Sequence, residues 1–554
     1  MFLPTTKSEM KKLGWKELDV IFVTGDAYID HPSMGISLLG HYLVSKGFKV
    51  GIIGQPDVNS DVDITRLGRP RLFFGISGGN VDSLVANYTA SLKKRRYDDY
   101  TPSSWGNKRP DRAVIVYSNL VKRYFKGIPI VIGGIEASLR RFAHYDWWAD
   151  KLRKSILLDA KADLLVYGMG EKTVLEIAKC MEKYGSVGKC KDIRGIVWWT
   201  SKKLNGAVEI PSYEEILNDK IKYNEAFKKL TILTDPNKNL KIIQKQDTRY
   251  VVQNSPQFPL DRREFDNLYL LPFEREVHPF YLKYGNVKAI ETVRFSITAV
   301  RGCYGMCAFC ALTQHQTTHI VSRSKESILE EVKILKRMKK FKGTITDVGG
   351  PTANMYGVDC SIRRFMGQCE RFCLFEKPCK NALVDHSILL DLLYSIKKEV
   401  KNVFISSGIR HDLVLADKNF GEIFIKELPK FTPGQLKLAP EHSHEKVLRL
   451  MRKPSIEKFL QFKKMYESNA KKRYVIAYFI VGHPGESFKE NNHLKKFIRK
   501  ELGYKPQQIQ IFTPTPGTLS TAIYYTGFDP LTNEKVYIEK RLSIRNKMKK
   551  NIMI

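Results

Sequence analysis

The feature of this sequence that most limits its fold is the alternation of short apolar runs with amphipathic stretches. The apolar run LDVIFVTG at residues 18–25 is followed by a helical stretch, ISLLGHYLVSKG, and then by a second apolar run, FKVGIIGQP. A strand, a helix and a strand in succession form the repeating unit of a doubly wound parallel sheet. Further apolar runs, which we interpret as strands, occupy residues 71–79, 112–119, 128–137 and 162–171. We therefore predict an α/β fold whose first domain, residues 1–200, is a doubly wound sheet.

The alternation stops and then resumes in the second half of the chain. Residues 201–285 are rich in proline, asparagine and charge, so we interpret them as a connector. After residue 286, strands are expected at residues 293–302, 343–350, 402–409, 434–440, 473–482 and 508–514. With helical stretches between them, these strands predict a partial (β/α) barrel over residues 286–520, whose chemistry lies at the carboxyl ends of the strands. We expect residues 521–554 to form a basic carboxyl-terminal tail, whose last fifteen residues are either a basic helix or frayed.

The charge of the chain favours a polyanionic partner. It has 92 Lys and Arg residues against 58 Asp and Glu residues, a net charge of +34. Such a surface attracts nucleic acids, and RNA is the partner we consider. The alternative is a general excess of lysine, because the basic residues are spread along the whole chain. We interpret local clusters beside aromatic residues, such as Lys93–Arg96 next to Tyr97 and Tyr100, as solvated surface.

The sequence predicts a cytoplasmic protein with no membrane partner. No apolar run is long enough to span a bilayer, and the first residues lack the layout of a secretory signal. The nine cysteines are an odd number in a long chain of this kind, which favours metal ligation or buried thiols over a disulfide framework.

Three cysteines lie close together in the stretch VRGCYGMCAFCALTQHQ, at residues 300–316. They are Cys303, Cys307 and Cys310. Thiolates prefer zinc, copper(I) or iron–sulfur clusters. Structural zinc generally takes four ligands, whereas three cysteines in one tight loop can ligate three irons of a 4Fe-4S cluster and leave the fourth iron open. A cluster is the favoured interpretation, with a zinc site and buried thiols as alternatives.

This motif resembles that of the radical S-adenosylmethionine (SAM) superfamily. The spacing Cys-x3-Cys-x2-Cys follows the first strand of the predicted barrel, and Phe309 precedes the last cysteine. The segments SSGIRHDL, LKLAPEHSHEKVLRLMRKP, YFIVGHPGES and IQIFTPTPGT look like the later strands of the same barrel. Together with DHPSMG near the start, they make nearly the full chain similar to the uncharacterised radical SAM proteins with a YgiQ-type amino-terminal domain. The amino-terminal domain is then expected to be cobalamin-binding-like in fold.

The resemblance implies a set of cofactors and contacts. The three cysteines would hold the 4Fe-4S cluster, and SAM would bind the open iron and be cleaved reductively to a 5'-deoxyadenosyl radical. Gly349 and Gly350 would contact the amino group of SAM, although Gly-Pro here replaces the more usual Gly-Glu. Phe309 would pack beside the adenine. The reducing electron would come from a donor such as a flavodoxin or ferredoxin.

Two polar residues follow predicted barrel strands without an assigned role. Arg410 lies in SSGIRHDL and Glu441 in LAPEH. Either one contacts the cofactor or the substrate, or both belong to surface ion pairs.

A second group of cysteines predicts another metal site. Cys360, Cys369, Cys373 and Cys379 are close in sequence, and His386 follows shortly after them. Four thiols so close suggest zinc or an auxiliary cluster. The alternative is a loop with incidental thiols.

The loop after the first strand departs from the motif of cobalamin-binding domains. That motif is Asp-x-His-x-x-Gly, whereas here Asp30 directly precedes His31 and three residues separate His31 from Gly35. We therefore do not expect cobalamin, and we expect a loop histidine bonded to its neighbours.

The function we infer from the sequence is that of a radical SAM enzyme of unassigned reaction. The later barrel motifs look nearest to those of methylthiotransferases, which together with the basic charge makes RNA modification the leading hypothesis. The alternatives are a non-catalytic, metal-dependent RNA-binding protein and a cobalamin-dependent radical methyltransferase.

Overall fold

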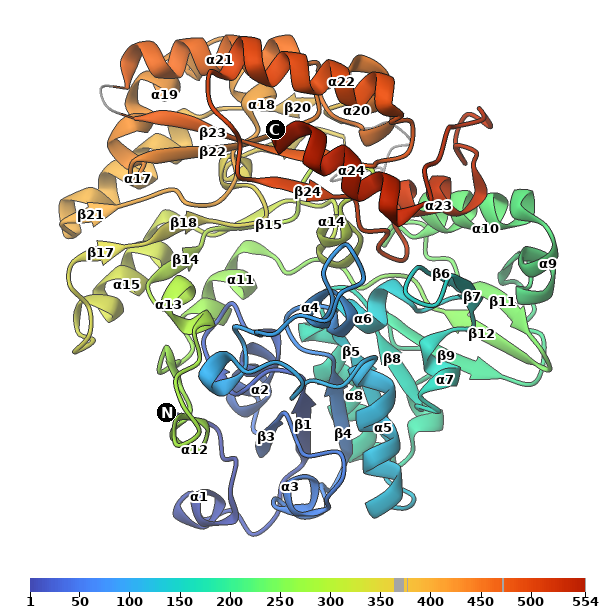
Figure 1. Cartoon of the computed structure of the whole chain (residues 1–554). Coiled ribbons are helices and arrows are strands. Elements are labelled where there is room, and N and C mark those ends of the chain that lie inside the picture. Colours follow the sequence, from blue (N-terminus) through green and yellow to red (C-terminus); the bar gives the residue numbers. More distant parts are fainter. Residues whose placement is uncertain (363–372, 376, 471–472, 554) are drawn as a thin grey trace. The chain divides into compact units, whose positions relative to one another are not determined.

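The computed structural model describes residues 1–362, 373–375, 377–470 and 473–553. They form two compact units (Figure 1). The first unit contains Met1–Leu260 and Asn267–Arg294, and the second contains Asp261–Asp266 and Phe295–Ile554.

The first unit is built on a nine-stranded sheet of order β10-β11-β12-β9-β8-β5-β4-β1-β3. Five neighbouring strands are parallel: β3 (Val50–Gly54), β1 (Val20–Thr24), β4 (Phe73–Ser77), β5 (Ile130–Gly133) and β8 (Leu164–Val166). Every residue of β1, β3 and β4 is buried, as expected of a parallel sheet covered on both faces. The doubly wound sheet predicted from the sequence is confirmed.

The order of these strands marks the place where such a sheet binds ligands. The chain enters at β1, moves to one side for β3, and then returns to the other side for β4, β5 and β8. The direction of winding therefore reverses between β1 and β4. In open α/β sheets the crevice at the carboxyl ends of the two strands beside this reversal is the usual ligand site.

One predicted strand in this unit is a helix. Residues 112–119, expected to be extended, lie mostly in α5 (Ala113–Tyr124). The buried residues Ala113, Val114, Tyr117, Leu120 and Val121 recur with helical spacing. A short apolar run does not by itself distinguish a buried strand from a buried helix, and here the helical period decided the structure.

The predicted connector, residues 201–285, also differs from the structure. It supplies β10 (Val208–Ile210), β11 (Ile242–Gln246) and β12 (Arg249–Gln253), which extend the sheet beyond β9 (Ile196–Thr200). β11 and β12 form an antiparallel hairpin whose turn contains Asp247, with a φ of 53°. Short strands with polar residues between turn-forming residues do not show the apolar alternation from which strands are predicted.

The second unit contains the parallel strands of a partial (β/α) barrel. β14 (Ser296–Thr298) pairs with β18 (Asp347–Gly349), and β17 (Thr344–Ile345) pairs with β21 (Asn402–Val403). The remaining strands form a parallel sheet of β22 (Gln435–Glu441), β23 (Tyr474–Val481) and β24 (Ile509–Ile511). This architecture confirms the predicted barrel.

Long helices separate the barrel strands along the chain. They are α15 (Lys325–Lys336), α17 (Ser387–Glu399), α21 (Ile456–Asn469) and α22 (Phe488–Phe497). In α15, Ser324 accepts a hydrogen bond from the backbone N–H of Ser327, and Ile328, Val332 and Leu335 are buried. The helical stretch expected between the first two barrel strands is confirmed, and Ser324 caps it.

The end of the chain is a packed helix, one of the two forms expected of it, and is not frayed. α23 (Leu519–Thr526) is followed by α24 (Leu542–Met553), which packs on α22 and β24. Arg545, Met548 and Ile552 of α24 are buried. Their spacing of three and four residues places them on one face, while the lysines between them, which suggested a tail, face away.

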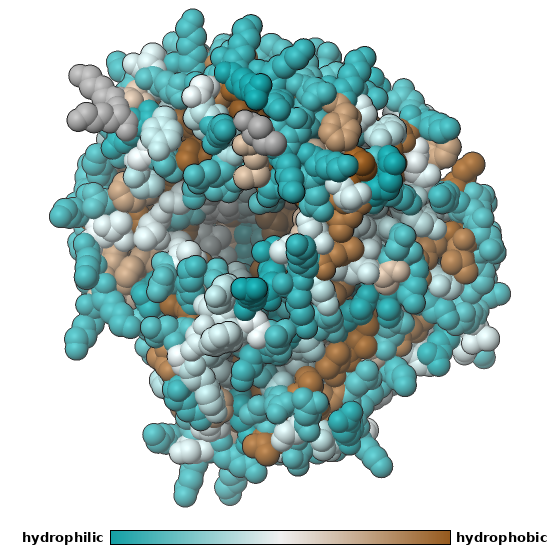
Figure 2. All heavy atoms as spheres, viewed as in Figure 1, coloured by the Kyte–Doolittle hydropathy of each residue, from teal (hydrophilic) through white to brown (hydrophobic). Residues whose placement is uncertain are grey.

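Hydrophilic residues predominate on the face drawn in Figure 2. Within the described residues, no helix combines the length and the apolar character that crossing a membrane requires.

Replacing Met548 with alanine should destabilise the second unit. Its side chain is 0% exposed, and removing a buried methionine side chain typically costs about 2–5 kcal/mol. Met553→Ala in the same helix is the control, because Met553 is 48% exposed and should change the urea midpoint very little. Equal midpoints for the two variants would show that α24 does not pack as described.

Candidate functional site

The three-cysteine loop begins where the first barrel strand ends. After β14 the chain forms β15 (Val300–Arg301), which pairs with β16 (Val321–Ser322), and Cys310 immediately precedes α14 (Ala311–Gln316). The backbone N–H of Cys310 donates to the carbonyl of Cys307 at 2.9 Å. The loop therefore turns back on itself and brings its thiols to the carboxyl end of the strand.

The surroundings of these thiols disfavour free thiolate ions but suit thiolates that are bound to a metal cluster. The N–H of Gly305 lies 3.3 Å from Sγ of Cys303, and Oγ1 of Thr352 lies 3.6 Å from it. Burial, followed by the neighbouring thiol of Cys307, raises the pKa of Cys303 and raises that of Cys310 to about 11. Bound iron would displace the protons from such thiols and supply the missing positive charge.

Within the described part of the chain, no three His, Cys, Asp or Glu side chains converge as the ligands of a single metal ion. That result is compatible with a cluster, since cysteines that ligate different irons do not share one coordination sphere.

Arg410 lies beside the cysteine loop. Its Nη1 is 3.5 Å from Sγ of Cys307, while Nε and Nη2 donate to the two carboxylate oxygens of Asp412 at 2.9 and 2.6 Å. Arg410 is only 6% exposed. Of the two roles expected for this residue, the surface ion pair is therefore wrong. The two-point bond to Asp412 fixes the guanidinium plane.

A chain of buried hydrogen bonds holds the backbone of Arg410 in place. Its backbone N–H donates to Oδ1 of Asn354 at 2.8 Å, and Nδ2 of Asn354 lies 3.1 Å from Nε2 of His386. Because that amide group is a donor, Nε2 is the acceptor, and Nδ1 of His386 carries the proton that it donates to Asp417 at 2.8 Å. His386 is therefore part of this hydrogen-bond chain. The roles of Asn354 and Asp417 were not predicted from the sequence.

Glu441 ends β22 in an unusual backbone conformation. Its φ is 71°, and the pairing of β22 with β23 is irregular between Leu438 and Glu441. The side chain is buried, which raises the pKa of Glu441 to about 7 against the opposing influence of Lys453 and Arg410. A non-glycine residue held at positive φ at the end of a barrel strand is characteristic of functional sites.

Gly349 and Gly350 end β18 where there is no room for a side chain. A Cβ at Gly349 would overlap Oγ of Ser407, and a Cβ at Gly350 would overlap the carbonyl oxygen of Val300. The structure therefore gives these glycines a packing role, whatever ligand they contact.

Phe309 contacts a residue of a later barrel segment. Its ring centroid is 6.3 Å from that of His483, edge to face. Nε2 of His483 lies 2.7 Å from Oγ of Ser520. The sequence did not single out His483, although it lies in the quoted segment YFIVGHPGES.

The backbone brings three cysteines of the second group near one hairpin. Cys360 lies in β19 (Asp359–Cys360), opposite Ala382 of β20 (Ala382–Leu383). The N–H of Ala382 donates to the carbonyl of Cys379, and the N–H of Cys379 donates to that of Cys373. Cys369 lies outside the described residues.

In the first unit, His31 is buried and both of its ring nitrogens are engaged. Nδ1 lies 2.7 Å from Oγ of Ser33, and Nη1 of Arg275 lies 3.0 Å from Nε2. Burial and then Arg275 hold the pKa of His31 well below its usual range, so the ring is neutral. This arrangement agrees with a loop histidine bonded to its neighbours.

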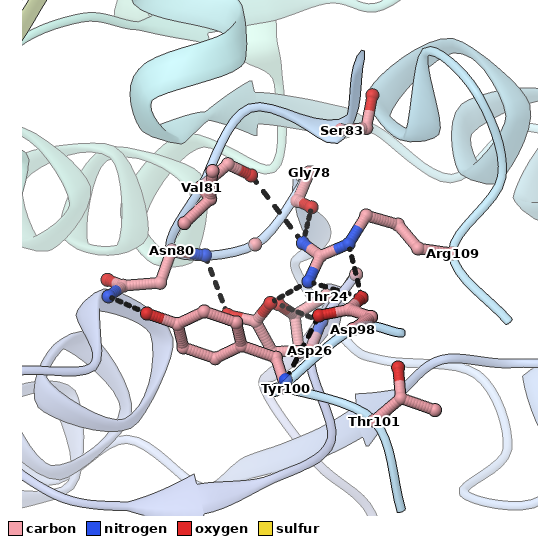
Figure 3. Close-up of polar contacts among 12 residues, drawn as sticks. Thr24, Asp26, Gly78, Asn80, Val81, Ser83, Asp98, Tyr100, Thr101 and Arg109 are labelled. Carbon is pink, nitrogen blue, oxygen red and sulfur yellow. Dashed lines mark hydrogen bonds and ion pairs between the residues drawn. The ribbon is translucent and has the colours of Figure 1, made fainter. Parts of the chain in front are cut away.

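The crevice between β1 and β4 is bridged by the chain's own side chains (Figure 3). Nη2 of Arg109 lies 2.7 Å from Asp26 and 3.0 Å from Asp98, and Nη1 donates to the carbonyl of Gly78 at 2.8 Å. The N–H of Asn80 donates to the other oxygen of Asp26 at 2.6 Å. This network was not predicted from the sequence, because its members are far apart along the chain.

Models of known families match almost the whole chain. Residues 2–296 match the radical SAM N-terminal domain, residues 297–498 match the radical SAM superfamily, and residues 507–553 match a domain of unknown function, DUF3362. The fold and these matches define the class of the protein, which is a radical SAM enzyme.

Curated relatives place it more narrowly. A UPF0313 protein of Thermotoga petrophila is 67% identical over 559 residues, covering 100% of this chain and 98% of the relative. A UPF0313 protein of Fusobacterium nucleatum is 48% identical, covering 99% of this chain and 98% of its own. The chain belongs to the UPF0313 family.

Solved structures share the fold at low identity. The radical SAM methyltransferase TsrM from Kitasatospora setae, solved with cobalamin and a 4Fe-4S cluster, covers 91% of this chain and 77% of its own, with a TM-score of 0.51 and 14% identity. The cobalamin-dependent SAM radical enzyme OxsB, solved with aqua-cobalamin, is similar over 91% of this chain and 55% of its own. The TM-score is 0.52 and the identity 12%. These similarities establish the architecture of the chain.

Replacing Glu441 with glutamine should stabilise the protein above about pH 7 and leave it nearly unchanged near pH 5. The pKa of Glu441 is about 7 in the folded chain against an ordinary 4.5, so ionisation favours the unfolded chain as the pH rises through that interval. Glutamine removes this effect, and the difference in urea midpoint from wild type should grow with pH. The exposed Glu445→Gln is the control. If both variants had the same pH profile, Glu441 would not be a buried carboxyl of raised pKa.

Proposed function

We propose that this enzyme binds a 4Fe-4S cluster through Cys303, Cys307 and Cys310 and cleaves SAM reductively. The observation that carries the proposal is the set of three thiols at the end of the first barrel strand, with the buried guanidinium of Arg410 3.5 Å from Cys307. When bound, the cluster supplies the electron that breaks the sulfonium bond and yields a 5'-deoxyadenosyl radical, which removes a hydrogen atom from the substrate.

The residues of the chain would position the reactants and control charge. Arg410 offsets the negative charge of the ligating thiolates, and Asp412 orients it. Gly349 and Gly350, which pack against Ser407 and Val300, would contact the amino group of SAM through their backbone, and Phe309 would cover the adenine. Glu441, beside Arg410 and Lys453, contacts the cofactor or the substrate in its protonated or ionised form near neutral pH. A flavodoxin or ferredoxin would deliver the electron.

We propose RNA as the substrate class. The support is the net charge of +34, because a polyanionic substrate is attracted to such a surface. The class of the protein is enzymatic, so the non-catalytic RNA-binding alternative is not retained.

Anaerobic turnover tests the proposed chemistry. The protein is reconstituted with iron and sulfide, reduced with dithionite and given SAM, with and without total RNA, and 5'-deoxyadenosine is quantified. Wild type should form it, and Cys303→Ala should not. Cys180→Ala, which removes a thiol of the first unit, should retain wild-type activity. Absence of product from wild type holding a full cluster, in both the presence and absence of RNA, would contradict the proposal.

We also propose a second metal site that includes Cys360, Cys373 and Cys379, binding zinc or an auxiliary cluster. The support is the backbone contact among their segments. Because the described side chains of these three cysteines do not converge on a single metal ion, an auxiliary cluster fits them better than zinc. A triple variant in which Cys303, Cys307 and Cys310 are alanine should retain zinc or iron, measured by elemental analysis, and adding Cys360→Ala should remove it. A triple variant free of both metals would contradict this second site.

We propose that the first unit does not bind cobalamin. TsrM and OxsB were solved with it, but their identity to this chain supports a shared fold only. Here His31 is engaged at both nitrogens, and Arg109 bridges the crevice between β1 and β4. After incubation with hydroxocobalamin and gel filtration, the protein should carry no corrinoid absorbance. Stoichiometric retention of the corrinoid would contradict this.

A further inference from the structure

Residues 88–109 form an irregular loop between α4 (Ser83–Asn87) and α5, which we call the aromatic loop. Tyr97 and Trp105 oppose each other across an antiparallel bridge in this loop. The flanking hydrogen bonds join Asp98 to Ser104 at 3.0 Å and Gly106 to Arg96 at 2.9 Å. This pattern defines a non-hydrogen-bonded pair, in which the two opposing side chains lie close together on the same face of the ribbon.

The two aromatic side chains face solvent. Tyr97 is 64% exposed and Trp105 is 68% exposed. Gly106 allows this close crossing, because a Cβ there would meet the carbonyl oxygens of Arg95 and Arg96 at 2.9 Å. A paired tyrosine and tryptophan held in solvent offer flat surfaces for stacking.

The aromatic pair follows a run of unpaired positive charge. Lys93, Lys94, Arg95 and Arg96 are all exposed, and none forms an ion pair with a carboxylate of the described residues. Asp99 beyond the pair lies 3.7 Å from Lys288. The positive charge of this run is therefore available to a partner.

The base of the loop is held rigidly. Alternation along the ribbon turns Asp98 inward, where it bonds Arg109, which in turn bonds Asp26 at the end of β1 (Figure 3). Nε2 of Gln55 donates to Oγ1 of Thr101 at 2.6 Å. The buried network therefore anchors the middle of the loop, at Asp98 and Thr101, and its end, at Arg109, to the sheet.

Its backbone also adopts several left-handed conformations. Non-glycine residues at positive φ in and beside the loop are Leu92, Ser103, Ser104, Asn107 and Arg112. Such conformations persist only where the surrounding structure enforces them, and they concentrate at binding sites.

We propose that the aromatic loop binds single-stranded RNA. Bases stack on Tyr97 and Trp105, and Lys93, Lys94 and Arg96 contact phosphates. Sequence-tolerant single-strand binding combines these two elements, exposed aromatic faces and adjacent positive charge. This inference deepens the proposed function and rests on it, because it takes RNA to be the substrate. Binding can be measured without SAM or reductant, so it can fail separately from the chemistry.

The test is the affinity of the full-length reconstituted protein for a fluorescein-labelled single-stranded oligouridylate, followed by fluorescence anisotropy. Tyr97→Ala and Trp105→Ala should each weaken binding by about tenfold, the usual effect of losing one stacked base. Exchanging Lys93, Lys94, Arg95 and Arg96 for glutamine should lower the slope of log affinity against log salt by about 0.7 for each phosphate contact that is lost.

A matched control separates the loop from general charge. Lys7, Lys11, Lys12 and Lys16, in and after α1 (Lys7–Lys12), are exposed. Exchanging these four for glutamine removes the same charge and should leave affinity close to wild type. Equal losses from the two quadruple variants, unchanged affinity of Trp105→Ala, or no binding of the oligouridylate would each overturn the proposal. So would loop-dependent binding of polyglutamate or of anionic phospholipid vesicles in place of RNA.

Discussion

The contact on which the functional site depends is that between the guanidinium of Arg410 and the thiol of Cys307. The proposed cluster, held by three thiolates, would concentrate negative charge among buried groups. The guanidinium of Arg410, 3.5 Å from Sγ of Cys307, would offset part of that charge. Asp412 holds the plane of that guanidinium, and the buried chain from Asp417 through His386 and Asn354 holds the backbone of Arg410. The cysteine loop is thus in contact with Arg410, which lies 103 residues after Cys307 and directly precedes α18 (His411–Ala416).

The first unit shows how the same kind of sheet can be used differently. Its winding reverses between β1 and β4, where α/β sheets usually receive a ligand. In this chain Arg109, Asp26 and Asp98 meet there. They fix the base of a loop that carries exposed aromatic and basic side chains. In this chain, the residues at the edge where α/β sheets usually receive a ligand hold the base of a loop whose Tyr97 and Trp105 are exposed.

Much of the fold could be predicted from the sequence, because strands buried on both faces leave continuous apolar runs that end in glycine. The Cys303 loop and the helical character of α15 could also be predicted from the sequence, because cysteine spacing and helical periodicity are local patterns. The predictions that failed rested on an ambiguous local pattern or on segments whose structure depends on tertiary contacts. The apolar run at 112–119 became part of α5, polar strands such as β11 joined the sheet edge, and the lysine-rich end packed as α24. The residues that hold the two arginines could not be predicted either. Asn354 and His386 near Arg410, and Asp26 and Asp98 at Arg109, come into place only when the chain folds.

The central claim is that the three-thiol loop leaves one iron open to SAM. It is tested most directly by the electron paramagnetic resonance spectrum of the dithionite-reduced protein, recorded before and after SAM is added. The account predicts the signal of a reduced 4Fe-4S cluster whose g values shift with SAM, because the amine and carboxylate of SAM bind the open iron. Protein with full iron and sulfide content whose spectrum is unchanged by saturating SAM would contradict it.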